Sequence, residues 1–206
     1  TNPRELASKM VGREIGRAPQ RPSVAIGGPV LELHELAALG DRGITVLNGI
    51  DLDVRAGEIH GIAGVAGNGQ RELAEVITGL RRAASGRVCI CGKDMTNSAP
   101  RSIIEAGVSH IPEDRLGMGL APNLDITLNA IMKRYRSGEM SRGPVMDEAR
   151  ARGWTGDLVE RFSVKTPNLR TAVRLLSGGN SQRLLLARET SCVHKLAVAV
   201  HHQFMH

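Results

Sequence analysis

Aromatic side chains are nearly missing from this sequence of 206 residues, of which they make up 2%. Proteins that bind single-stranded nucleic acid usually stack its bases on such rings. The net charge of +6 is in itself compatible with nucleic acid or with an anionic membrane surface. Because the basic residues are also spread along the chain, we expect no nucleic-acid partner and interpret the charge as a solvated surface that faces a membrane partner. The aromatic residues are Tyr135, Trp154, Phe162 and Phe204.

Cysteines and long apolar runs are also scarce. The three cysteines form neither a disulfide framework nor a zinc spacing. No apolar run approaches the roughly 20 residues that span a bilayer, and no signal peptide is recognisable. We therefore expect a globular protein of a reducing cytoplasm, without a metal site. The histidine-rich end has no zinc spacing either: Cys192, His194, His201, His202 and His206.

The first third of the chain alternates between strand and helix signals. Prolines and glycines among scattered charges predict a linker over residues 1–28, and apolar alternation predicts half-buried antiparallel strands over 30–54. Residues 58–65, EIHGIAGV, are apolar on both faces, which predicts a central strand. A glycine loop follows, and then a helix with apolar positions at Leu73, Val76, Ile77 and Leu80.

The rest of the chain predicts further strands at 87–91 and 108–111, with a helix beginning at Pro100 between them. Residues 125–162 contain two helical stretches around a polar break, and we predict no strand there. The sequence HKLAVAV, from residue 194, predicts a buried strand. Before it, a Ser-Gly-Gly turn precedes a helix whose apolar stripe is Leu184, Leu185, Leu186 and Ala187.

Residues 64–71, GVAGNGQR, have the glycine spacing of the phosphate-binding loop G-x-x-x-x-G-K-[ST]. Backbone N–H groups at the start of the next helix favour residual phosphate binding. The lysine for the β and γ phosphates and the hydroxyl for magnesium are replaced by glutamine and by an arginine that would repel the metal. The alternative is a tight strand-to-helix turn without a ligand. The candidate residues are Gly64, Gly67, Asn68, Gly69, Gln70 and Arg71.

The Ser-Gly-Gly turn lies in LSGGNSQR, residues 176–183. Ser177 offers a hydroxyl, Gly178 and Gly179 leave bare amides, and the following helix directs its positive end toward an incoming anion. The alternative is a serine N-cap with flexible glycines before a structural helix.

These residues resemble the signature motif of ATP-binding cassettes (ABC proteins), and LSGGN followed by Gln182 is the variant typical of sugar and nucleoside importers. GIAGVAGNGQRELAEVITGL resembles the start of the second cassette of tandem importer ATPases, and MVGRE at 10–14 resembles the junction between the cassettes. IPEDR resembles the Q-loop segment, with Glu113 in place of its glutamine. The resemblance implies an α/β P-loop NTPase fold of the ABC type, with an antiparallel β subdomain and a helical insert.

The chain also departs from this family. No aromatic residue between 31 and 53 is available to stack on adenine, and His34 is the nearest substitute. The family continues into a Walker B strand, a D-loop and a switch histidine, whereas here no acidic residue follows Glu189. We therefore assign no catalytic residue and no magnesium ligand. The end of the chain is expected to be truncated or aberrant, which would leave the fold incomplete at its C-terminus.

The resemblance implies an ATP-binding component of an importer for simple sugars or nucleosides, located in the cytoplasm on the inner face of the cell membrane. Its expected partners are a second cassette and transmembrane permease subunits. In this family each ATP lies between the glycine loop of one cassette and the signature of the other, so Ser177, Gly178 and Gly179 are expected to serve the partner's site. ATP binding at its own loop is expected to be weak, with doubtful magnesium dependence.

Two alternatives remain. One is a regulatory nucleotide-sensing or structural pseudo-ATPase module. The other, less favoured, is a translation-type cassette that acts on ribosomal RNA. The predicted boundaries are a linker at 1–28, a nucleotide-binding domain at 29–190 with its insert at about 121–170, and a tail at 191–206.

Overall fold

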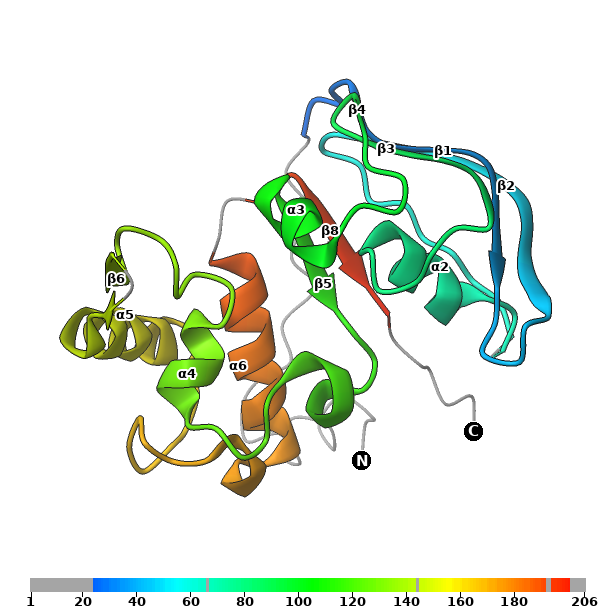
Figure 1. Ribbon diagram of the computed structural model, residues 1–206. Coiled ribbons are helices and arrows are strands. Elements are labelled where there is room, and N and C mark those ends of the chain that lie inside the picture. The colour runs from blue at the N-terminus through cyan, green and yellow to red at the C-terminus, as the bar shows by residue number, and fades with distance from the viewer. Residues whose placement is uncertain (1–23, 66, 144, 192–193, 201–206) are drawn as a thin grey trace, which may run out of the picture.

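The computed structural model describes residues 24–65, 67–143, 145–191 and 194–200 (Figure 1). The predicted linker motif at 10–14 and most of the histidine-rich end lie outside these residues.

A four-stranded antiparallel sheet forms one side of the molecule, in the order β2-β1-β3-β4. Alternating apolar residues direct one face of β1 into the core, as the sequence predicted for antiparallel strands. The predicted strand at 87–91 is β3, shifted by one or two residues at its ends. The strands are β1 (Pro29–Leu39), β2 (Thr45–Arg55), β3 (Ser85–Ile90) and β4 (Lys93–Asp94).

Helix α2 (Gln70–Ile77) packs beneath this sheet (Figure 1). It buries Leu73, Val76 and Ile77, as the helical periodicity predicted. Leu80 does not belong to this stripe, because the helix ends before it and its side chain is 52% exposed. The core between the sheet, α2 and the parallel strands described next includes Leu31, Leu33, Leu36, Leu47, Val88, Ile90, Val108 and Leu196.

A parallel pair of strands lies between the antiparallel sheet and the helical side of the molecule (Figure 1). Strand β5 (Val108–Ile111) pairs with β8 (Leu196–Ala199), so two strands that are 88 residues apart at their paired ends, Val108 and Leu196, lie side by side. Both strands were predicted from their apolar runs, but β8 is not buried as expected, because Ala197 and Ala199 are exposed. Helix α3 (Pro100–Glu105) precedes β5 and buries Ile103 against this core.

The central strand predicted at 58–65 is wrong for this structure. The segment has no regular secondary structure, and Ile59, Ile62 and Val65 are 72%, 53% and 75% exposed. A strand that is apolar on both faces is stable only where other elements cover both faces and neighbours pair with its edges. None of the described strands pairs with these residues.

The helical side consists of α4 (Ile126–Ile131), α5 (Glu148–Arg161) and α6 (Gly178–Thr190), with the short helical turns η1 (Arg115–Gly119) and η2 (Val173–Leu175). Their apolar faces meet in a second core, which confirms the predicted stripe of the last helix at three of its four positions. Leu186 is only partly buried. This core includes Leu120, Ile126, Leu158, Val173, Leu184, Leu185 and Ala187.

The expectation that residues 125–162 contain no strand is also wrong. Strands β6 (Ser141–Arg142) and β7 (Val145–Met146) form a short antiparallel hairpin in the polar break. Gly143 lies between them with φ +63°, a left-handed conformation that favours glycine in tight hairpin turns.

Candidate functional site

The glycine loop ends at Gly69, which is the N-cap of α2 and has φ +93°. A β-carbon at this position would lie 3.0 Å from both the Leu47 side chain and the Val46 carbonyl oxygen. Glycine is therefore required for the loop to enter the helix at this angle. The structure thus places the predicted glycine loop directly before a helix, although the segment that precedes it is not a strand.

Gln70, which replaces the loop lysine, folds back into the loop. Its Nε2 donates to the Val65 carbonyl oxygen over 3.4 Å. A β-carbon at Gly64 would lie only 2.3 Å from the same nitrogen, so the amide packs directly against that glycine. The neutral amide thus lies against the loop backbone, and no lysine charge is present to attract a phosphate.

Arg71, which replaces the hydroxyl residue, belongs to a charged cluster at the start of α2. Its Nε donates to Glu75 Oε1 over 2.7 Å. Arg81 holds the other carboxylate oxygen of Glu75 at 2.8 Å and Asp41 at 2.6 Å. The hydrogen bond that Arg71 donates to Glu75 raises the pKa of Arg71 above its ordinary value, so the guanidinium stays charged. The i,i+4 spacing of Arg71 and Glu75 was a sequence signal for this pair, but the sequence analysis missed it.

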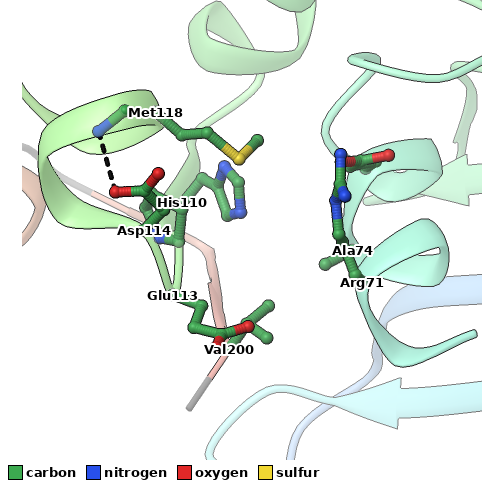
Figure 2. A pocket seen from close by; sticks show the side chains of 10 residues that line it. Arg71, Ala74, His110, Glu113, Asp114, Met118 and Val200 are labelled. Atoms are coloured by element: carbon green, nitrogen blue, oxygen red, sulfur yellow. Dashed lines mark hydrogen bonds and ion pairs between the residues drawn. The ribbon is translucent and has the colours of Figure 1, made fainter. Parts of the chain in front are cut away.

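A cavity of about 360 Å³ lies between α2 and the segment that follows β5 (Figure 2). Arg71 and Ala74 line it from α2, and His110, Glu113 and Met118 face them from the other side. The structure therefore brings the predicted Q-loop residue Glu113 to the same cavity as Arg71. The other predicted loop residues do not line this cavity: Gly64, Gly67, Asn68, Gly69 and Gln70.

His110 was assigned only to a strand in the sequence analysis, but its side chain lines this cavity. Burial lowers its pKa below the ordinary value, and the nearby charge of Lys133 lowers it further, against the opposite effects of Glu189 and Glu75. The imidazole is therefore neutral near pH 7, and protonating it at acid pH works against the folded state.

The signature turn lies elsewhere. Ser177 is the N-cap of α6, and Ser177, Gly178 and Gly179 are exposed and do not line the cavity. Arg115 Nη1 donates to the Gly178 carbonyl oxygen over 3.1 Å and to Gln182 Oε1 over 3.3 Å. Gln182 is therefore held by its own chain, through an arginine for which the sequence analysis predicted no role.

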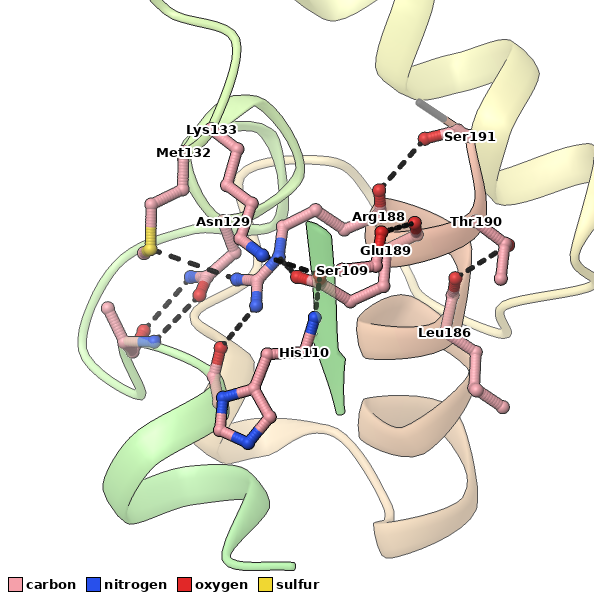
Figure 3. A network of polar contacts seen from close by, with 12 residues as sticks. Ser109, His110, Asn129, Met132, Lys133, Leu186, Arg188, Glu189, Thr190 and Ser191 are labelled. Atoms are coloured by element: carbon pink, nitrogen blue, oxygen red, sulfur yellow. Dashed lines mark hydrogen bonds and ion pairs between the residues drawn. The ribbon is translucent and has the colours of Figure 1, made fainter. Parts of the chain in front are cut away.

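The other end of α6 is anchored by a buried carboxylate (Figure 3). The Glu189 side chain is 0% exposed, and it accepts from Arg188 Nε over 2.9 Å and from Lys133 Nζ over 2.5 Å. The backbone N–H of His110 donates to the same carboxylate over 3.0 Å. Arg188 Nη2 also donates to the Gly119 carbonyl oxygen over 2.7 Å. This network joins the helix of the signature to β5, to η1 and to the end of α4.

A family model described as "ABC transporter" matches residues 47–199. The chain belongs to the ABC transporter family. Its fold is that of an ATP-binding cassette: it resembles a nucleotide-free ATP-binding cassette from an ABC transporter with a TM-score of 0.64 at 21% identity, over 83% of this chain and 68% of that one. The ADP conformation of MJ1267, another such cassette, gives a TM-score of 0.63 at 17% identity, over 85% of this chain and 82% of that one.

Curated relatives of this ABC cassette are import proteins. It is 46% identical to the glucose import ATP-binding protein TsgD13 of Haloferax volcanii over 95% of this chain and 36% of that protein. It is 40% identical to the guanosine import ATP-binding protein NupO of Bacillus subtilis over 92% of this chain and 37% of that one. The cassette thus spans little more than a third of these relatives. Among its described residues, no helix is long and apolar enough to cross a membrane.

Proposed function

We propose that this ABC cassette is the ATP-binding component of an importer for simple sugars or nucleosides, with a degenerate ATP site of its own. We further propose that Ser177, Gly178 and Gly179 complete the ATP site of a partner cassette. The import roles named for the relatives support the first statement. The observation that carries the second is the exposed signature turn at the start of α6, outside the cavity that Arg71 and Glu113 line.

The same proposal places the chain as the second cassette of a subunit, peripheral on the inner face of the membrane and in contact with permease subunits. Its parts would be a linker at 1–28, the nucleotide-binding domain at 29–190 and a tail at 191–206. The helical pair α4 and α5 lies within the proposed insert at about 121–170, which supports this division.

The residues at the start of α2 do not fit a magnesium ion. Magnesium prefers oxygen ligands in octahedral geometry, but a guanidinium occupies the position of the usual hydroxyl. Both carboxylate oxygens of Glu75 already accept from arginines, one from Arg71 and one from Arg81. In the described part of the chain, no group of three or more acidic, histidine or cysteine side chains is arranged to hold a metal.

ATP is therefore expected to bind this chain weakly and with little effect of magnesium. Backbone amides at the end of the glycine loop still offer donors to a phosphate, although the N–H of Asn68 already donates to the Val65 carbonyl oxygen over 3.3 Å. The metal ligands are missing. Calorimetric titration with ATP, with and without magnesium, should give affinities within a factor of ten, or about 1.4 kcal/mol. The double variant Gln70→Lys with Arg71→Thr restores both missing groups and should bind more tightly and gain magnesium dependence. A larger magnesium effect in the unaltered chain would contradict this prediction.

The isolated chain is also expected to release no phosphate from ATP above background. The lysine is absent from the loop, and an arginine stands in place of the hydroxyl that holds magnesium. A steady-state phosphate-release assay on the purified chain measures this. Turnover that disappears in the Gln70→Ala variant would show that the loop is catalytically active after all.

A regulatory nucleotide-sensing or structural pseudo-ATPase module is the second candidate, and the replacement of the loop lysine by the neutral Gln70 favours it. The two candidates differ in the assembled importer. A regulatory module would bind nucleotide there while variants of Ser177 leave ATP hydrolysis unchanged, whereas the main proposal requires Ser177 for hydrolysis.

A further inference from the structure

The hydroxyl of Ser177 accepts two hydrogen bonds from one residue. Asn180 Nδ2 lies 3.0 Å from Ser177 Oγ, and the backbone nitrogen of Asn180 lies 3.4 Å from the same oxygen. The second contact is the ordinary N-cap bond that a serine makes at a helix start. The first is an additional contact from the asparagine of the LSGGN sequence.

The orientation of the Asn180 amide is fixed by a third residue. The backbone N–H of Lys165, in the segment after α5, donates to Asn180 Oδ1 over 2.9 Å. A backbone N–H can only donate, so the oxygen of the amide must face Lys165. The NH2 group, which can only donate, therefore faces Ser177.

These contacts determine what the Ser177 hydroxyl can still do. A hydroxyl has one proton and two acceptor positions, and both donors from Asn180 occupy the acceptor side. Within the ranges that the structure describes, no group accepts a hydrogen bond from Ser177, and the side chain is exposed. The proton is thus left for an acceptor outside this chain, and phosphate oxygens are such acceptors.

We infer that Asn180 is a positioning residue that makes Ser177 a hydrogen-bond donor toward the terminal phosphate of ATP held by the partner cassette. This inference rests on the proposed function, in which the signature turn completes that site. In this inference Asn180 does not contact ATP itself. It acts only by fixing the direction in which the Ser177 hydroxyl points its proton.

The test uses two double-mutant cycles in the assembled importer, with ATP hydrolysis as the readout. Asn180→Asp keeps the shape and the acceptor for Lys165 but replaces the donor by an acceptor, so Ser177 would turn its proton inward. Asn180→Ala removes the donor without adding charge. We expect Ser177→Ala and Asn180→Asp each to lower kcat by about 10-fold to 100-fold, the range for one hydrogen bond to a charged group. Asn180→Ala should lower it less.

In the Ser177→Ala background, neither Asn180 change should lower kcat further by more than about twofold, because the proton is already gone. Multiplicative losses in both cycles would overturn the inference, since Asn180 would then act by charge or by folding.

Thermal unfolding supplies a further readout: a carboxylate in the first turn of a helix is favourable, so Asn180→Asp should not lower the melting temperature. If Ser177→Ala itself leaves hydrolysis unchanged, the proposed function fails together with the inference. If only the cycles are multiplicative, the proposed function stands.

Discussion

Replacing Ser177 by Arg in the assembled importer is expected to lower both ATP hydrolysis and transport by at least about 100-fold, because added bulk and charge increase the loss of about 10-fold to 100-fold that removal of the donor alone causes. The substitution removes the hydroxyl and adds bulk where a phosphate must approach closely. Gly178 and Gly179 leave no side chain there, and a β-carbon at Gly179 would meet nothing within 4 Å. The turn is thus exposed and has free space beside Gly179, as the proposed approach of a partner's phosphate requires. Hydrolysis and transport are measured together in reconstituted membranes.

Two controls separate this role from folding and from the cassette's own loop. Asp147 caps α5 as Ser177 caps α6, so Asp147→Arg makes the same kind of change at a helix start without a proposed role. It should leave hydrolysis nearly unchanged. Gln70→Ala should change hydrolysis by no more than about twofold to threefold, as surface substitutions do, because the lysine is already absent. Equal sensitivity at positions 70 and 177 would mean that this cassette runs its own catalytic site.

The sequence predicted those parts of the fold whose stability is local. Capped helices such as α6 and alternating strands such as β1 are determined by neighbours in the chain, and both were predicted correctly. The segment 58–65 was not, because a strand that is apolar on both faces depends on neighbours that periodicity does not specify. The hairpin in the helical region was missed because its strands are two residues long, too short for a period-two pattern.

In the candidate site too, features set by neighbours in the chain were predicted, and contacts between distant segments were not. The positions of Gly69 and Ser177 at helix starts were predicted correctly, because both belong to motifs with fixed spacing. Their roles toward ATP stay predictions. The contacts of Arg115 with Gly178 and of Lys165 with Asn180 join residues 63 and 15 positions apart. Such pairs are invisible in a single sequence, because nothing in the local pattern states which loop will face which helix.

Glu189 is the clearest of these long-range residues, and Glu189→Ala is expected to lower the free energy of unfolding by about 3–5 kcal/mol. The change leaves Arg188, which is 5% exposed, and Lys133, which is 18% exposed, without their shared carboxylate. It also removes the acceptor of the His110 N–H. Urea unfolding of the chain measures the loss as a shift in midpoint at constant slope.

Glu148 provides the matched control. It pairs with Arg152 over 2.7 Å, but its side chain is 68% exposed, so Glu148→Ala should cost no more than about 0.5 kcal/mol. Glu189→Gln keeps the shape and one acceptor oxygen and should lose less than Glu189→Ala. A loss below about 1 kcal/mol for Glu189→Ala would contradict the assignment of this carboxylate as the anchor of α6.

A second change tests whether the loss of stability in Glu189→Ala comes from buried cations that have lost their carboxylate partner. Lys133→Met removes one of the two cations, so adding it to Glu189→Ala should cost less than the sum of the two single changes. Breaking a buried pair is expensive mainly because the remaining partner stays buried and uncompensated. Arg188 would still lack its carboxylate in the double variant, so it should remain less stable than the unaltered chain. Because the network joins α6 to β5 and α4, its loss would also release the helix that carries the signature turn.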